Sequence, residues 1–300
     1  MRLATVSLDG RPTAAVVTDE HVHEIPGQTL GGLIESGLDN ALEMASTALS
    51  GHAIPLSKVT LELPYHPPSV RDFVTFESHV EGVRRIIEGA PGVPEAWYDA
   101  PTFYFTNPHA LYGPGAPIRR PASSRALDFE LEVGAVLGRG GTSFTPAEAA
   151  RAIFGYTIIN DWSARDLQSR EMQVGLGPAK GKDFATSIGP WIVTADELAP
   201  FVDPDGFLDL DCQVSVNGLP VGRDRLSHMR WTFSQMIAYA SRDSVVRAGD
   251  LLGSGTTGGG GCLAELWGRR GSRTPPPLEP GDQVVITVEG IGTLNTRIED

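Results

Sequence analysis

Short hydrophobic runs separated by turn residues dominate the pattern along the chain. Two of them, Leu3–Ser7 and Thr13–Val17, alternate apolar and polar positions around Asp9-Gly10, which predicts a β-hairpin. A longer stretch, Thr29–Leu49, repeats its apolar residues at helical spacing and predicts an amphipathic helix. Val59–Leu63 then predicts another strand.

A proline-rich segment after this strand divides the chain. We place a domain boundary there, between a small N-terminal domain over residues 1–65 and a main domain over residues 66–300. In the main domain the pattern predicts helices at Phe76–Glu88, Pro146–Ile153, Ser163–Met172 and Thr232–Ala240. It predicts strands at Thr102–Phe105, Leu127–Leu137, Phe154–Ile159, Ile188–Val193, Leu208–Val216, Leu251–Gly253 and Gln283–Val288. Together with 35 glycines and 23 prolines, these runs predict a mainly β (α+β) fold.

Charge and composition narrow the functional class. The formal net charge is −13 and no basic cluster stands against it, so we expect no nucleic-acid partner. No apolar run approaches the roughly 20 residues that a membrane span requires, and the N-terminal segment lacks an apolar signal region. Cys212 and Cys262 form no Cys/His cluster, and we expect both to be reduced. A soluble, cytoplasmic protein is therefore expected, without a membrane partner.

The segment Leu127–Gly134 carries the most informative acidic pattern. In a strand, Asp128, Glu130 and Glu132 share one face, while the residues between them face the other way. Adjacent carboxylates on one face are costly to bury unless a cation neutralises them. An edge strand with an acidic, water-facing side is the commoner arrangement, so this pattern alone leaves metal binding open.

Two further segments supply candidate partners. Asn160 and Asp161 lie where a strand runs into a helix, and hard divalent cations take such oxygen ligands. The same segment also fits a helix N-cap, with Ser163 and Asp166 as a capping-box-like pair. His79 is a candidate general base because its ordinary pKa lies near neutral pH. A lone histidine is more often a surface or packing residue, so His79 alone is weak support.

Two glycine motifs are set aside. Gly181-Lys182-Asp183 lacks the preceding glycine and the following Ser/Thr of a P-loop. The Gly255–Gly261 loop shows no signal for a following helix and no downstream acidic residue in a βαβ unit, so we expect no dinucleotide site.

The acidic strand, the strand end and the histidine belong to a longer series of matching segments. RDFVTFESHV, GAPIRRP, LDFELEVG, NDWSARDLQ, GKDFATSIGPW and GSGTTGGGGCLAEL resemble, in the same order, the catalytic domain of the fumarylacetoacetate hydrolase family. The resemblance spans about residue 70 to the C-terminus. It implies a mixed β-roll/β-sandwich catalytic domain beside a small, variable N-terminal α+β domain, and a homodimer.

The resemblance also implies roles for particular residues. Metal ligands are implied at Glu130, Glu132 and Asp161, with Asp72 as a fourth, and the cation is expected to be Mg²⁺, with Mn²⁺ or Ca²⁺ as alternatives. His79 matches the water-activating base and Glu265 the carboxylate that orients it. Lys182 and Gln168 match polar groups facing the reacting carbonyl. Substrate contacts are implied at Tyr104, Thr186 and Thr256, and at Arg84 or Arg85, where the spacing after His79 differs from the family.

The expected activity is hydrolysis of a C–C bond in a small oxo-carboxylate, a 3-acylpyruvate or related 1,3-diketo acid resembling fumarylacetoacetate or fumarylpyruvate. A metal-stabilised enolate would leave as His79 activates water. The same site could instead decarboxylate oxaloacetate, or isomerise or hydrate an unsaturated 2-oxo-diacid. A binding protein that sequesters a metal–carboxylate complex is a further alternative, but it would need no base beside its ligands. Specificity is expected to reside in Glu81–Trp97, which could cover the site.

Overall fold

The computed structural model describes residues 1–87 and 89–300. Its N-terminal residues form the predicted hairpin, in which β1 (Arg2–Leu8) pairs antiparallel with β2 (Arg11–Val17). Asp9 and Gly10 both take positive φ angles, 51° and 75°, as a tight two-residue hairpin turn requires. The single helix expected at Thr29–Leu49 is instead two helices, because Gly37 takes a φ of 87° between them. These are α1 (Leu30–Ser36) and α2 (Leu38–Ala48).

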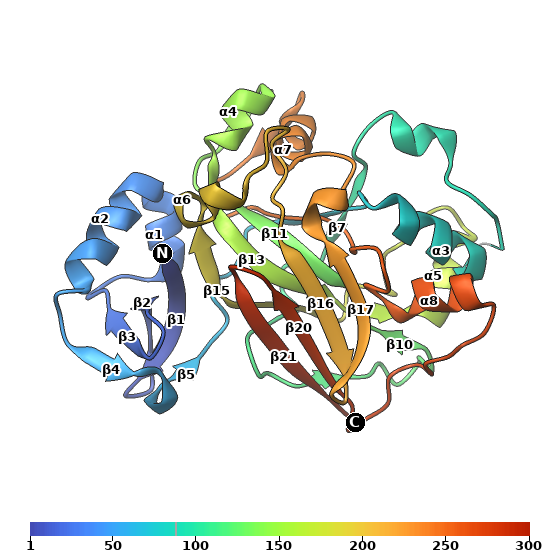
Figure 1. Cartoon of the computed structure of the whole chain (residues 1–300), viewed down its shortest axis with the longest axis horizontal. Coiled ribbons are helices and arrows are strands. Elements are labelled where there is room, and N and C mark those ends of the chain that lie inside the picture. The colour runs from blue at the N-terminus through green and yellow to red at the C-terminus, as the bar shows by residue number, and fades with distance from the viewer. Residues whose placement is uncertain (88) are drawn as a thin grey trace.

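One long sheet runs from this N-terminal unit through the whole described molecule (Figure 1). The first part of its strand order is β4 (Ala53–Pro55), β3 (His21–Glu24), β2, β1 and β15 (Thr186–Thr194). It continues with β13 (Ile153–Asp161), β11 (Leu131–Leu137), β19 (Leu251–Gly253), β6 (Val70–Phe73) and β7 (Phe103–Thr106). Two short strands join at its sides, β5 (Thr60–Leu61) on β1 and β8 (Leu111–Tyr112) on β15.

A second sheet packs in front of the central strands of the first (Figure 1). Its strand order is β17 (Leu219–Arg225), β16 (Asp211–Val216), β20 (Gln283–Val288), β21 (Gly292–Glu299) and β9 (Ile118–Arg119). Alternate residues of the two sheets, including Leu131, Val133, Ile286 and Leu294, are buried in one core. Two small ribbons complete the strands, β10 (Leu127–Asp128) with β14 (Ser163–Ala164) and β12 (Gly141–Thr142) with β18 (Val245–Val246). The expected mainly β (α+β) fold is confirmed.

Helices gather at two places around the sheets (Figure 1). At one end, α3 (Glu77–Ile87), α5 (Arg165–Met172) and α8 (Leu263–Arg270) lie together. Above the sheets are α4 (Pro146–Ala150), α6 (Ala195–Leu198) and α7 (Phe233–Ser241). Glu88, the last residue of the helix expected at Phe76–Glu88, lies outside the described residues. Among the described helices, we find none with the length and apolar character needed to cross a membrane.

Helix α8 corrects one sequence-based expectation. We expected no helix after the Gly255–Gly261 loop, and this was wrong, because α8 begins at Leu263. Its cap is Cys262, whose sulfur accepts from the backbone N–H of Glu265 at 3.4 Å in place of the usual Ser, Thr, Asn or Asp. The unusual cap and the interior Gly268 weakened the helical signal.

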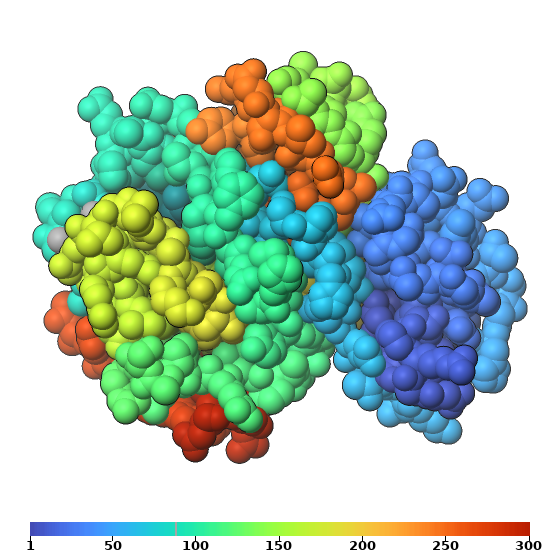
Figure 2. All heavy atoms as spheres, turned by 180° about the vertical axis from the view of Figure 1, so that it is seen from behind, coloured from blue at the N-terminus to red at the C-terminus, as the bar shows by residue number. Residues whose placement is uncertain are grey.

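The N-terminal residues form a lobe at one side of the molecule, seen from behind in Figure 2 (blue). The lobe is joined to the rest through the β1–β15 pairing, in which Leu3 faces Ile192. Helix α1 adds Leu30 and Ile34 to a core that includes Ile188 of β15. The domain boundary near residue 66 stays a prediction.

Candidate active site

Adjacent strands of the long sheet deliver four acidic side chains to one region. Strand β11 pairs with β13 on one side and with β19 on the other, and β19 pairs with β6. Glu132 lies in β11, Glu130 immediately precedes it, Asp161 ends β13, and Asp72 lies in β6. All four side chains are buried. Pairing of distant segments therefore gathers residues 72, 130, 132 and 161 at one place.

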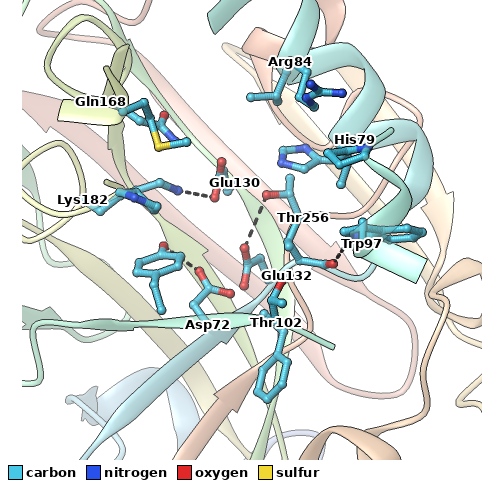
Figure 3. Close-up of a pocket in the computed structure, with 18 of the residues that line it drawn as sticks. Asp72, His79, Arg84, Trp97, Thr102, Glu130, Glu132, Gln168, Lys182 and Thr256 are labelled. Carbon is cyan, nitrogen blue, oxygen red and sulfur yellow. Dashed lines mark hydrogen bonds and ion pairs between the residues drawn. The ribbon is translucent and has the colours of Figure 1, made fainter. Parts of the chain in front are cut away.

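Three of these carboxylates form a compact cluster (Figure 3). Oxygen atoms of Asp72, Glu130 and Glu132 all lie within 4.8 Å of one another. Asp161 is joined to the cluster indirectly, since Lys182 Nζ lies 2.5 Å from Glu130 Oε2 and 2.5 Å from Asp161 Oδ2. The Tyr104 hydroxyl donates to Asp72 Oδ2 at 2.9 Å and also bonds to Asp161. The four predicted ligands are thus near neighbours.

Several oxygens in this cluster are buried but unused. Asp72 Oδ1, Glu132 Oε2 and Asp161 Oδ1 have no hydrogen-bond partner among the described residues. Gly253 faces two of them, because a Cβ at that position would lie 2.8 Å from Glu132 Oε2 and 2.9 Å from Asp72 Oδ1. Buried, unpaired carboxylate oxygens are costly, and hard divalent cations take such ligands. The acidic triad Asp72, Glu130 and Glu132 can therefore hold a metal ion.

Burial and the close approach of several negative charges shift the pKa values of the clustered carboxyl groups. Burial, together with the neighbouring Asp161 charge, raises the pKa of Asp72 to about 8. Burial and the Asp72 charge raise the pKa of Glu132 well above its ordinary value. Glu130 behaves differently: burial raises its pKa, but the Lys182 and Arg165 cations outweigh this and hold it below the ordinary value. Asp72 and Glu132 therefore bind protons readily when no cation balances their charge.

The first turn of α3 brings His79 to the same region. Its side chain is buried, and burial lowers its pKa to about 4. The ring is therefore neutral near pH 7 and can accept a proton. Its Nδ1 atom lies 3.7 Å from the sulfur of Cys262.

Glu265 lies nearby but is bonded elsewhere. Its carboxylate accepts from Gly260 N at 3.2 Å and from Arg269 Nη1 at 3.1 Å. In residues 1–87 and 89–300 no hydrogen bond joins Glu265 to His79, so the expected pairing of base and orienting carboxylate is not formed here. The thiol of Cys262 is instead the polar neighbour of His79 Nδ1.

The sequence-based reasoning gave no role to Arg165, although it lies within the matching segment NDWSARDLQ. Its guanidinium is buried, with Nε 2.8 Å from Asp128 Oδ2, Nη2 2.8 Å from Glu130 Oε1, and Nη1 donating to Gln168 Oε1 at 3.0 Å. The sequence feature that could have indicated this role is an arginine at the start of a helix that follows an acidic strand end. Arg165 therefore fixes both Glu130 and Gln168.

Asp128 does not join the acidic cluster, although the alternation placed it on the same face as Glu130 and Glu132. The strand expected at Leu127–Leu137 is interrupted after Asp128, so β10 and β11 are separate. The Asp128 carboxylate accepts from Leu263 N at 2.8 Å and Ala264 N at 2.9 Å, at the start of α8. Its role here is to cap a helix and pair with Arg165.

A cavity of about 400 Å³ opens above the carboxylates. Most of the predicted site residues line it: Asp72, His79, Arg84, Tyr104, Glu130, Glu132, Gln168, Lys182 and Thr256. Three predicted residues do not line it: Asp161, Thr186 and Glu265. The segment expected to cover the site contributes Val83, Pro94, Ala96 and Trp97, while Glu88 within it lies outside the described residues.

Of the two arginines proposed as a substrate contact, Arg84 faces the cavity and Arg85 pairs with Glu81 at 2.6 Å. The cavity thus combines carboxylates, a neutral histidine and buried cations. A sequence comparison places the part of the chain that forms this cavity in a known family. The profile of the fumarylacetoacetate (FAA) hydrolase C-terminal domain matches residues 69–299. The chain belongs to the fumarylacetoacetate hydrolase family.

Individual members of the fumarylacetoacetate hydrolase family agree with this assignment. The fumarylacetoacetase of Arabidopsis thaliana is 33% identical over 284 residues, which cover 77% of this chain and 67% of that protein. This chain therefore spans about two thirds of the length of the plant enzyme.

Two solved family structures cover the whole chain. A fumarylacetoacetate hydrolase from psychrophilic Exiguobacterium antarcticum is 27% identical with a TM-score of 0.77, covering 100% of this chain and 99% of that one. A 5-carboxymethyl-2-hydroxymuconate delta-isomerase from Mycobacterium smegmatis is 29% identical with a TM-score of 0.71, covering 100% and 98%. The chain is a family enzyme whose relatives include hydrolases and isomerases.

Proposed function

We propose that this protein is a Mg²⁺-dependent hydrolase that cleaves the bond between C3 and C4 of a 3-acylpyruvate. The observation that carries the proposal is the composition of one cavity. Buried carboxylate oxygens without partners lie beside a neutral, buried histidine and two hydrogen-bond donors, Lys182 and Gln168. A site that only sequesters a metal–carboxylate complex would need the carboxylates but not the histidine.

The acidic triad would hold the cation, with Asp161 beside it. Its donor atoms are carboxylate oxygens, which suit Mg²⁺ best, while Mn²⁺ and Ca²⁺ accept the same ligand type. When bound, the cation supplies Lewis-acid polarisation of the 2-oxo group of the substrate. Lys182 pairs with both Glu130 and Asp161, and together with Arg165 it holds the pKa of Glu130 below its ordinary value, so Glu130 stays ionised in the cavity.

The remaining side chains would move the protons and bind the developing charge. His79 accepts a proton from water as the water oxygen attacks the acyl carbonyl at C4. The C3–C4 electron pair is then released onto C3, which takes up a proton, so the products are pyruvate and the carboxylic acid of the acyl group. Gln168 and Lys182 would donate to the oxygen that becomes negative, and one such donor is worth about 2.7–4 kcal/mol.

Isomerisation or decarboxylation of a related oxo-diacid is the second candidate. The likeness to the Mycobacterium smegmatis isomerase supports it, since that protein has 29% identity over the full chain. Both reactions would use the same carboxylates. They differ in whether water is consumed, since only hydrolysis incorporates a water oxygen into a product.

A substrate panel tests the proposal. Purified protein is incubated with acylpyruvates, oxaloacetate and 2-oxohept-3-ene-1,7-dioate, with Mg²⁺ or with chelator. We expect loss of the acylpyruvate enol absorbance and release of one pyruvate per substrate, only with the metal present. Turnover confined to oxaloacetate or the heptenedioate would favour the second candidate, and metal-dependent binding without product would favour sequestration.

A homodimer and a cytoplasmic location, without nucleic-acid or membrane partners, stay predictions. Sedimentation velocity of the purified protein would measure the oligomeric state directly.

A further inference from the structure

The cavity of the candidate active site has two chemically different ends. The carboxylate end contains the acidic triad with Lys182 (Figure 3), and the Tyr104 hydroxyl donates to Asp72 there. Gln168 and His79 line the cavity above the triad. The remaining lining residues are mostly hydrocarbon: Val74, Val80, Val83, Pro94, Ala96, Trp97, Met172 and Pro178. Val74 lies between β6 and α3, Val80 and Val83 lie in α3, and Pro94, Ala96 and Trp97 lie in the segment after it. Met172 ends α5 and Pro178 lies in the loop beyond, so separate parts of the chain supply apolar side chains. We call these eight residues the apolar wall.

Trp97 presents ring surface rather than a hydrogen-bond donor to this space. Its indole Nε1 donates to the backbone oxygen of Val74 at 2.7 Å. Trp231 packs against the ring with centroids 5.0 Å apart, which holds it in place. With its one polar atom engaged, Trp97 offers a ligand mainly hydrocarbon contact.

Two of the cations that line the described cavity pair with an acidic side chain, and the other is bonded to the backbone. Among the lining residues that the structure describes, the cations are Arg84, Arg165 and Lys182. Arg165 and Lys182 both pair with Glu130. Figure 3 shows Arg84 at the opposite end from Asp72 and Glu132. Its Nη1 donates to the backbone oxygen of Gly92 at 2.8 Å, so this guanidinium already braces the segment after α3.

A second carboxylate on the substrate would lose water on entering the apolar wall. Burial of an anion is unfavourable unless charge and hydrogen bonds replace its hydration. The wall supplies methyl groups, proline rings and an indole face instead, and these stabilise hydrocarbon.

From this division of the cavity we infer that the acyl group of the substrate is an uncharged hydrocarbon chain, so the substrate is a monocarboxylate rather than a dicarboxylate. The inference rests on the proposed function, because it places the pyruvate half at the carboxylate end. The acyl chain then extends along Val80, Val83 and Trp97.

A matched pair of substrates tests the inference with the full chain and saturating Mg²⁺. 2,4-Dioxoheptanoate and 2,4-dioxoheptanedioate have the same seven-carbon skeleton and differ only in a terminal methyl or carboxylate. We expect kcat/KM to be at least about tenfold higher for the monoacid. Shortening the monoacid to 2,4-dioxopentanoate should lower kcat/KM by about fourfold for each CH₂ removed, the factor expected for a buried methylene.

Substitutions in the wall provide a second, independent readout. Val83→Lys adds a cation to the apolar wall, and Val83→Met enlarges the side chain without charge. The ratio of kcat/KM for the monoacid to that for the diacid should fall at least about tenfold in Val83→Lys and change less than about threefold in Val83→Met. Thermal melting of both variants shows whether each is folded before the ratios are compared.

The outcomes separate the inference from the function on which it rests. Equal or faster cleavage of the diacid by the unmodified protein would overturn the inference and leave acylpyruvate hydrolysis standing. Cleavage of neither acid, with binding or turnover of other oxo-acids, would overturn the proposed function itself. A preference for the monoacid that Val83→Lys reverses would support both.

Discussion

The carboxylate of Glu132 is the least satisfied group in the cavity. It is fully buried, one oxygen has no described partner, and the other receives only a 3.4 Å bond from the Thr256 hydroxyl. Burial and neighbouring negative charges both oppose its ionisation. Such a residue is unfavourable for the metal-free protein and useful only when a cation is bound.

Glu132→Gln should therefore have opposite effects on stability and on metal response. We expect the melting temperature of the metal-free variant to be no lower than that of the unmodified protein, because a neutral amide replaces a carboxyl group whose ionisation is opposed by burial and neighbouring charges. With Mg²⁺ at about 100 times its Kd, the unmodified protein should gain about 2.7 kcal/mol of stability, and the variant should gain almost none. Calorimetric melting with and without Mg²⁺ measures both effects.

The exposed Glu43→Gln variant in α2 is the matched control and should keep the full response to Mg²⁺. A Glu132→Gln protein that still gained stability from Mg²⁺ would remove this residue from the metal site.

His79 sets the expected pH dependence. Burial lowers its pKa to about 4, so the ring stays unprotonated as pH falls from 8 to 5. If His79 is the base, kcat at saturating Mg²⁺ and substrate should hold nearly constant over that range and decline only as pH falls through about 4. His79→Gln should lower kcat by about 10²–10⁴-fold while Mg²⁺ still raises the melting temperature.

His109→Asn, at an exposed histidine, should leave the pH profile of kcat unchanged. An acid limb centred near pH 6.5 in the unmodified protein would contradict a buried base, and full activity of His79→Gln would exclude His79 from the chemistry.

At the scale of elements, close packing of α3 against α8 positions His79. Both helices present a glycine at the crossing, and a Cβ at Gly268 would lie 1.9 Å from the backbone oxygen of Gly82. A Cβ at Gly82 would in turn lie 2.7 Å from Glu265 Cγ. Any side chain at this crossing must move α3, and His79, Val83 and Arg84 move with it.

Gly268→Ala should destabilise the protein by about 2 kcal/mol and lower kcat, because the backbone of α3 is forced away. Gly31→Ala in α1 is the matched control: no atom lies within 4 Å of its added Cβ, so stability should stay equal or rise by about 0.5 kcal/mol. Urea unfolding and steady-state kinetics of the two variants make the comparison. Unchanged kcat in Gly268→Ala would mean that the crossing does not position His79.

The strands and helices around the site show which of its features the sequence alone could predict. Alternation in Leu127–Gly134 correctly oriented Glu130 and Glu132, because strand geometry is local. It misplaced Asp128, because the break after that residue depends on the start of α8, 135 residues further along the chain. The family resemblance predicted Asp72 and Lys182 as site residues, and both line the cavity. The neighbours of His79 depend on the α3–α8 crossing, which the spacing of residues along the sequence does not predict.

At the scale of the whole molecule, the N-terminal lobe and the metal-binding strands share one sheet. Strand β1 covers the edge of β15, and Leu3 and Ile34 pack in the same core as Ile192. The family profile begins at residue 69, whereas the sheet continues across that point. Sequence similarity and structural continuity therefore divide the chain differently.

A protein lacking residues 1–65 tests whether the main domain is independent. The deletion exposes the β15 edge and apolar residues that several buried Leu and Ile side chains now cover, each worth about 1.5–3 kcal/mol. We expect the melting temperature to fall by at least about 10 °C, with aggregation in size-exclusion chromatography. A soluble fragment that melts cooperatively at the original temperature would support the boundary near residue 66.

The crowded carboxylates couple the exchange of protons with the exchange of metal ions between protein and solution. Burial and neighbouring charges raise the pKa of Asp72 to about 8 and also raise that of Glu132, and a divalent cation would need the same oxygens that bind these protons. Uptake of the metal must then acidify a weakly buffered solution, while acidification expels the metal. The protein would act as an ion exchanger, coupling its loading state to the acidity of its surroundings.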